Sequence, residues 1–332
     1  MRGSLNSKLE RLRADYARVA GRSFVHFFCP VLFKDEEAEP CKAHIVPKAF
    51  PRSSRAWTVQ RKDVDGFYGT NFEDDFAAIR YRIEGQTPSQ VLTDTTLSRR
   101  FRPTIRVHGE PVGYFVAREA VPEHFTPVTL QGEGKSIRLG LKIPPGSASA
   151  EAVEKLDIEI AKDVRIPALV SLIKAAHLTL FDMLGYRYAL SAGGHFVGGQ
   201  ILGAFFCRNH AKSKSEVAEE AVVFFREFAH MARAVNSHPG FGGTITDRSV
   251  LVCRASRGLV WALIVFVRTS ELLHAVVIPV LDQPDAAAMY YSFLHNDNDS
   301  IEVSSCHLGQ DSWEIHPEVG TLVWPKTGGL YQ

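Results

Sequence analysis

Four side chains near the N-terminus have the types and the spacing of a metal site. His26 and Cys29 form an H-x2-C pair, and Cys41 and His44 form a C-x2-H pair further along the chain. Two such pairs supply the four nitrogen and sulfur ligands that a tetrahedral structural zinc ion needs. One interpretation is therefore a Zn²⁺ ion that holds a small subdomain together.

A second interpretation starts from the segments HIVPKAF (residues 44–50) and DVDGFYGTNFEDDF (residues 63–76). Together they resemble the HNH nuclease family over about a sixth of the chain. The resemblance implies a ββα-metal unit, in which a hairpin and a helix hold one divalent ion. It makes His44 the general base that activates water, and it makes Asp65 and Glu73 the ligands of a Mg²⁺ or Mn²⁺ ion.

The sequence departs from the family pattern at two places. Ala43 stands where an acidic residue usually precedes the histidine, and Arg61 and Val64 stand where the family has a second pair of cysteines. Two functions therefore stay open. The first is a metal-dependent endonuclease that cleaves phosphodiester bonds, with host defence as a setting by analogy. The second is a catalytically silent nucleic-acid-binding or assembly protein with a structural zinc site.

Basic residues indicate nucleic acid as the partner, with DNA as the expected substrate. Up to Lys62 the chain has 13 Lys and Arg against 6 Asp and Glu. The segment RRFRPTIR (residues 99–106) interleaves arginines with an aromatic side chain, a pattern that can follow a phosphate backbone. The predicted contact residues are Arg55, Arg61, Lys62, Arg99, Arg100 and Arg102.

Helices and strands must position these residues. Apolar spacing predicts an amphipathic helix over residues 7–19 with Ser7 as its N-cap. Residues 24–33 are predicted as a strand or a buried turn, and residues 57–59 as a strand. A helix is predicted over residues 71–81, with Asn71 as its N-cap and acidic residues in its first turn.

Further along the chain, apolar and polar residues alternate, which is the pattern of β-strands. Residues 104–119 predict a hairpin that turns at residues 109–111. One helix is predicted over residues 167–184 and ends before Gly185, and a second helix is predicted over residues 215–235. The apolar run over residues 249–281 predicts two or three strands.

These elements predict an α+β fold, in which an N-terminal ββα-metal module is followed by a larger mixed α/β domain. The predicted divisions are an N-terminal helix, the HNH-like module, a β-rich segment with a linker, and an α/β C-terminal domain; their ranges are residues 1–22, 23–85, 86–160 and 161–332.

Composition limits the class of protein. The chain has 332 residues, of which 45% are hydrophobic and 23% are charged, so it can bury a core. The longest apolar stretches, such as residues 259–267, are too short to cross a bilayer. Five sparse cysteines suit a reducing compartment. We therefore expect a cytoplasmic protein without a membrane partner, and a protein partner or self-association through the C-terminal domain.

Overall fold

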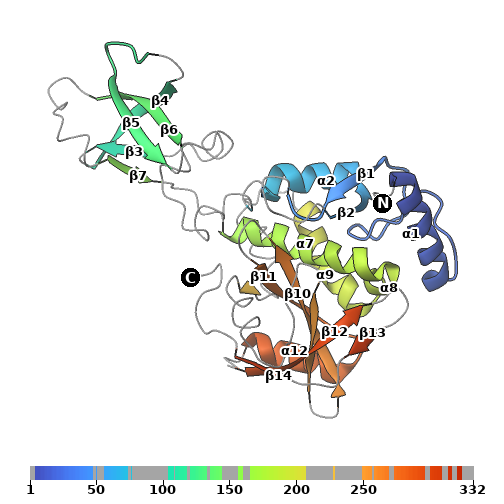
Figure 1. The fold of residues 1–332 in the computed structure, drawn as a ribbon. Coiled ribbons are helices and arrows are strands. Elements are labelled where there is room, and N and C mark those ends of the chain that lie inside the picture. Colours follow the sequence, from blue (N-terminus) through green and yellow to red (C-terminus); the bar gives the residue numbers. More distant parts are fainter. Residues whose placement is uncertain are drawn as a thin grey trace. The chain divides into compact units, whose positions relative to one another are not determined.

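The chain divides into two units, seen in a computed structural model (Figure 1). Unit 1 contains residues Met1–Ala77 and Arg165–Gln332, and unit 2 contains residues Ala78–Val164. The structure describes residues 4–47, 50, 56–73, 76, 104–107, 109–117, 120–132, 135–143, 156–159, 165–206, 227–228, 249–255, 258–268, 273–295, 300–308, 313–315 and 320–323. Of the helix predicted over residues 215–235 the structure describes only residues 227 and 228, which form a strand and not a helix.

Unit 1 begins with a helix, a hairpin and a second helix. Their bounds are α1 (Leu5–Ala20), β1 (Pro40–His44), β2 (Trp57–Arg61), α2 (Lys62–Tyr68) and the π-helical segment η1 (Gly69–Glu73). The strands are antiparallel, with Cys41 opposite Gln60 and His44 opposite Trp57. Residues 24–33 are turns and bends, with one bridge from Phe28 to Asp35. The hairpin therefore leads directly into helical structure.

Two predicted helix starts are wrong. Ser4 caps α1, because its hydroxyl oxygen accepts a hydrogen bond from the backbone N–H of Ser7 at 3.1 Å. Of the helix predicted over residues 71–81, residues 74, 75 and 77–81 lie outside the described residues, and its predicted start at Asn71 is not a helix start, because α2 begins at Lys62 directly after β2 and η1 continues it. Asn71 lies inside η1, and its side-chain amide donates to the carbonyl oxygen of Phe67 at 2.8 Å. Asp63 and Asp65 therefore belong to the first turn of α2.

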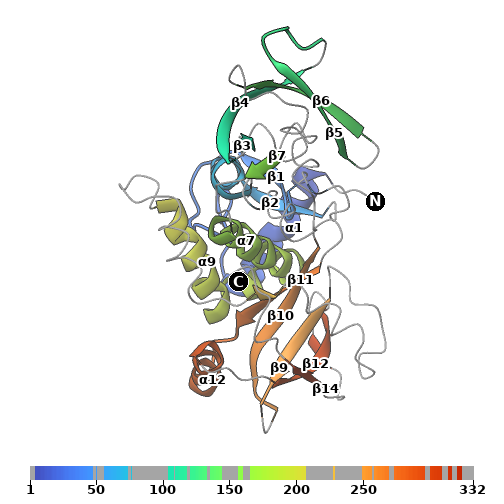
Figure 2. The same cartoon turned by 90° about the vertical axis from the view of Figure 1, so that its left-hand side faces the viewer.

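The helix α7 (Arg165–Leu184) lies at the centre of unit 1 (Figures 1 and 2). It packs against β2 and η1 of the N-terminal segment and against the C-terminal sheet. Residues 168–181 are all buried, which explains why this helix is apolar on every side. Gly185, with φ of 60°, ends it as predicted, and α8 (Tyr186–Ala189) and α9 (Ala192–Phe206) follow.

The C-terminal part of unit 1 is an antiparallel sheet with strand order β13-β12-β9-β10-β11-β8, and β14 also pairs with β12. Its elements are β8 (Glu227–Phe228), β9 (Val250–Arg254), β10 (Val260–Arg268), β11 (Leu273–Pro279), α12 (Pro284–His295), β12 (Ser300–Leu308), β13 (Trp313–Ile315) and β14 (Gly320–Val323). The strands predicted over residues 249–281 are confirmed as β9, β10 and β11. α12 packs on Ile264 and Phe266, and β10 is buried along most of its length.

Unit 2 is a separate antiparallel sheet with strand order β5-β6-β4-β3-β7. Its strands are β3 (Thr104–Val107), β4 (Glu110–Ala117), β5 (Thr126–Gly132), β6 (Lys135–Lys142) and β7 (Leu156–Glu159). The predicted hairpin is confirmed as β3 and β4, with Gly109 at a φ of 83° in the turn. Positive φ at this position favours glycine.

The predicted class, a mixture of helices and sheets of the α+β kind, is confirmed at that level. Among the described residues no helix is long and apolar enough to cross a membrane.

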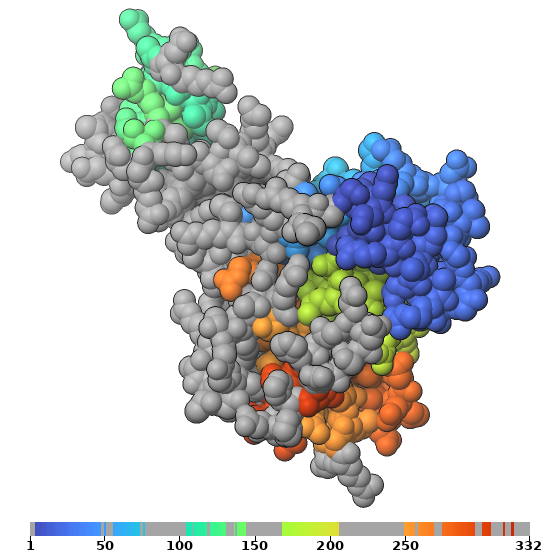
Figure 3. All heavy atoms as spheres, turned by 45° about the vertical axis from the view of Figure 1, so that its right-hand side comes forward, coloured from blue at the N-terminus to red at the C-terminus, as the bar shows by residue number. Residues whose placement is uncertain are grey.

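In the space-filling view, the N-terminal segment lies directly against the residues of the α7 region (Figure 3).

Candidate site at the N-terminal hairpin

The two predicted metal ligands converge on a lysine. The Nζ atom of Lys174, on α7, lies 2.6 Å from Oε1 of Glu73 and 3.5 Å from Oδ1 of Asp65. Its side chain is 1% exposed, whereas the side chains of Asp65 and Glu73 are 31% and 18% exposed. α2 and η1 thus bring the two carboxylates together, and α7 supplies the cation between them.

Electrostatics keep this lysine charged. Burial alone would lower the pKa of Lys174, but the negative charges of Glu73 and Asp65 outweigh burial and raise it above its usual value. The ammonium also lies 5.3 Å from the centre of the Tyr68 ring. Burial, with the charge of Asp65, raises the pKa of Cys41 to about 11, so its thiol stays protonated at neutral pH.

His44 lies on the other face of the hairpin. Alternation along β1 places Cys41 and Ala43 on one face and Lys42 and His44 on the other. The Lys42 ammonium lies 4.9 Å from the centre of the Trp57 ring, which stands opposite His44. Cys41, in contrast, is close enough to Asp65 and Lys174 to respond to their charges. The predicted general base therefore lies on the opposite face of β1 from Cys41, the residue whose pKa responds to Asp65 and Lys174.

The four predicted zinc ligands do not form one group. Cys29 is fully buried, and its Sγ atom accepts a hydrogen bond from the N–H of Leu32 at 3.5 Å. The residue His26 is exposed, and the pKa of the half-buried Cys41 responds to the charges of Asp65 and Lys174. Across the described part of the chain, no three His, Cys, Asp or Glu side chains lie close enough together to hold a metal ion.

The donor set therefore does not fit a divalent ion, either as Mg²⁺ or Mn²⁺ at Asp65 and Glu73 or as Zn²⁺ at the cysteine and histidine pairs. A divalent ion needs several oxygen or nitrogen ligands directed at one point. Here both carboxylates are directed at an ammonium group that belongs to the protein.

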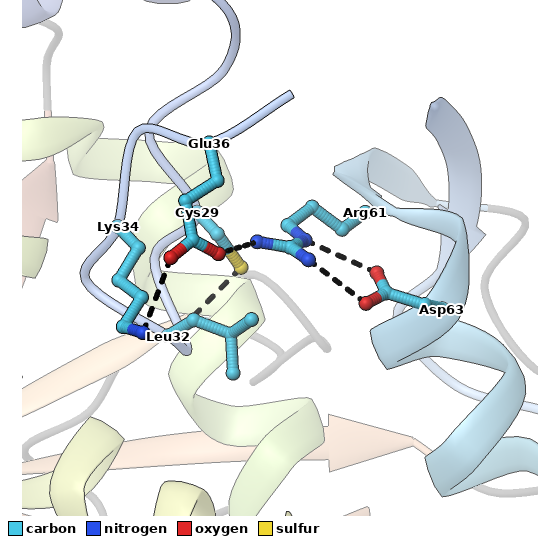
Figure 4. A network of polar contacts seen from close by, with 6 residues as sticks. All are labelled: Cys29, Leu32, Lys34, Glu36, Arg61 and Asp63. Atoms are coloured by element: carbon cyan, nitrogen blue, oxygen red, sulfur yellow. Dashed lines mark hydrogen bonds and ion pairs between the residues drawn. The ribbon is translucent and has the colours of Figure 1, made fainter. Parts of the chain in front are cut away.

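A second ionic group holds the loop before β1 to the start of α2 (Figure 4). The Arg61 guanidinium donates to both carboxylate oxygens of Asp63, at 3.1 and 2.9 Å, and to Oε2 of Glu36 at 2.9 Å. Glu36 also pairs with Lys34 at 3.1 Å. Hydrogen bonds from Arg61 and Lys34 lower the pKa of Glu36. Arg61 therefore connects the loop before β1 to the first turn of α2.

The predicted nucleic-acid contacts on this segment are already engaged. Arg61 is 11% exposed and is bound by two carboxylates, and Lys62 pairs with Glu39 at 2.8 Å. Other cations of the segment also have acidic partners, among them Lys8 with Asp182 on α7. The remaining predicted contacts, Arg55, Arg99, Arg100 and Arg102, lie outside the described residues.

Sequence reasoning missed the residue that organises the site. Lys174 stands in the apolar run ALVSLIKAAHLTLF, whose periodicity predicts a helix but gives the lysine no role. A charged residue on a helix that is apolar on every side must find a partner inside the protein. The signal was therefore present, but the partners lie about a hundred positions earlier in the chain.

No family model matches the chain, and neither the curated proteins nor the solved structures compared with it include a match.

Proposed function

We propose that the protein is a catalytically silent nucleic-acid-binding or assembly protein. An internal cation, instead of a metal ion, neutralises the two acidic residues of its N-terminal segment. The observation that carries the proposal is the position of Lys174, buried between Asp65 and Glu73. An ammonium there neutralises the acids without the open coordination position that a catalytic ion needs. In this role the hairpin and α2 form a rigid scaffold.

The metal-dependent endonuclease is the competing proposal. One observation favours it: a hairpin followed by a helix, with the half-buried His44 at the end of β1, is the order that the HNH resemblance implies. Against it stand the location of His44 on the opposite face of the hairpin from Cys41 and the engagement of both predicted metal ligands by Lys174.

A cleavage assay separates the two proposals. Purified protein is incubated with single-stranded and duplex DNA and RNA, with Mg²⁺ or Mn²⁺ and with EDTA. We expect no cleavage above background, and no difference between the native protein and His44→Ala. Cleavage that EDTA stops, and that His44→Ala lowers by about a hundredfold, would instead establish the endonuclease.

A further inference from the structure

The sheet of unit 2 has one apolar face and one mixed face. The buried residues of its core are Ile105, Val107, Val128, Leu139 and Leu141. Alternation along β6 places its core residues on one face, and Arg138, Gly140 and Lys142 on the other. Arg138 and Lys142 are both exposed. The outer face of the sheet therefore presents two cations with a glycine between them.

An aromatic ring lies over that glycine. Phe115 on β4 stands opposite Gly140 in the register of the sheet. A Cβ atom at Gly140 would lie 2.3 Å from the Phe115 ring, so only glycine permits this position of the ring. The Phe125 ring meets it edge-on, with the centroids 4.9 Å apart at 81°. Both rings are half-buried, which leaves part of each accessible in a fixed orientation.

The two cations lie on either side of Gly140, the residue that the Phe115 ring covers. Arg138 and Lys142 are four residues apart on one strand, which corresponds to about 13 Å between their Cα atoms. Neither forms an ion pair with any residue that the structure describes. They are therefore available to an anionic ligand, unlike Arg61 and Lys174 in unit 1.

We propose that the outer face of unit 2, formed by Phe115 and Phe125 with Arg138 and Lys142, binds single-stranded nucleic acid. An unpaired base stacks on Phe115, while phosphates on either side pair with the two cations. Stacking on a side chain requires a base that is free of its own partner, which favours a single strand over a duplex. The class of partner rests on the proposed function; the surface also suits the competing endonuclease.

The stacking contact is tested with the full-length chain, by fluorescence anisotropy of a labelled short oligothymidylate at low salt. Phe115→Leu keeps an apolar cover over Gly140 but removes the aromatic ring. We expect it to weaken binding about tenfold, the scale of one lost stacking contact. Phe115→Tyr, which keeps a ring, should bind like the native protein. An abasic strand of equal length has no base to stack, so the native protein and Phe115→Leu should bind it with equal affinity.

The ionic contacts are tested by reversing both charges. Arg138→Glu with Lys142→Glu should weaken binding further and reduce the slope of log affinity against log salt by more than about 1.4, the value for two lost phosphate contacts on a single strand. The matched control is Arg11→Glu with Arg22→Glu, which changes the charge equally at two exposed positions of unit 1. The control should keep the native affinity and slope.

The outcomes separate the two proposals. If the native protein binds the single strand but neither unit 2 variant weakens binding, or if the control weakens it equally, the surface is wrong. Tighter binding of a duplex also overturns it. A native protein that binds no nucleic acid at low salt overturns both the surface and nucleic acid as the partner. Metal-dependent cleavage contradicts only the proposed function. Melting curves verify that each variant is folded.

Discussion

The hairpin region of unit 1 and the outer sheet face of unit 2 use the same residue types in opposite ways. Lys174 and Arg61 are directed inward and are bound by carboxylates, whereas Arg138 and Lys142 are exposed and without ion pairs among the described residues. A buried cation is held by its partners and is costly to remove alone, whereas an exposed cation is open to an anionic ligand. We therefore expect the basic excess of the N-terminal segment to be a poor guide to where nucleic acid binds.

The largest expected effect comes from removing the buried cation. Lys174→Met leaves two carboxylates facing each other without their partner, and we expect the free energy of unfolding to fall by about 3–5 kcal/mol. Urea denaturation measures the loss. Lys174→Met combined with Asp65→Asn and Glu73→Gln should recover most of it, because no uncompensated charge then stays at the site. Equal destabilisation of the single and triple variants would contradict an ionic role.

The next effect depends on pH and involves His177, three residues further along α7. His177 is fully buried, with Nδ1 2.9 Å from the Tyr188 hydroxyl and Nε2 3.1 Å from the Pro30 carbonyl oxygen. A carbonyl only accepts, so Nε2 carries the proton of a neutral ring and Nδ1 accepts from Tyr188. Burial lowers the pKa of His177 from 6.5 to about 4.

The sign of the effect follows from proton uptake. Between pH 4 and pH 6.5 the unfolded chain binds a proton at this histidine and the folded chain does not, so stability falls as the pH drops through that window. The full loss is about 3 kcal/mol. Denaturation at several pH values should show it for the native protein, and His177→Gln should remove that part of the pH dependence. A flat native profile across this window would be the contrary result.

A smaller effect of opposite sign is expected on β2. Thr58 is fully buried, and its hydroxyl has no hydrogen-bond partner among the residues that the structure describes. Thr58→Val replaces this hydroxyl by a methyl group of similar shape, so the variant should be more stable by about 1 kcal/mol. Thermal unfolding measures the gain, with Thr179→Val as the control, because the Thr179 hydroxyl donates to the Ala175 carbonyl at 2.8 Å. A destabilised Thr58→Val would indicate a hydrogen bond at that position.

The smallest effect on stability is expected at the exposed cations of unit 2. Arg138→Ser and Lys142→Ser should change the free energy of unfolding by less than about 0.5 kcal/mol, because neither side chain has an ion pair among the described residues. A loss as large as that of Lys174→Met would show that these cations are structural and would remove the contrast between the two regions.

Local sequence patterns predicted elements better than sites. The hairpin β3–β4, the end of α7 at Gly185 and the strands β9 to β11 follow from periodicity and turn residues, which act over a few positions. The pattern does not predict α2, because β2 runs into this helix without a loop, and Asn71 does not cap a helix, because its side chain bonds backward to the Phe67 carbonyl oxygen. Propensity alone does not distinguish these two uses of an asparagine.

The site depends on contacts that local patterns do not contain. Lys174 meets Glu73 across 101 positions of sequence, and Lys8 meets Asp182 across 174. Tertiary packing decides these pairs. The family resemblance identified Asp65 and Glu73 as partners of a cation, but it implied a metal ion where α7 brings an ammonium.

The most direct test is whether the site needs a divalent ion. The melting temperature of the native protein is compared in EDTA and in excess Mn²⁺, beside that of Lys174→Ala. A ligand that binds only the folded state raises its stability. We expect the native protein to melt at the same temperature in EDTA and in Mn²⁺. Lys174→Ala, whose two carboxylates lack a cation, should melt at a higher temperature in Mn²⁺ than in EDTA. A native protein that EDTA destabilises would contradict the lysine as the resident cation.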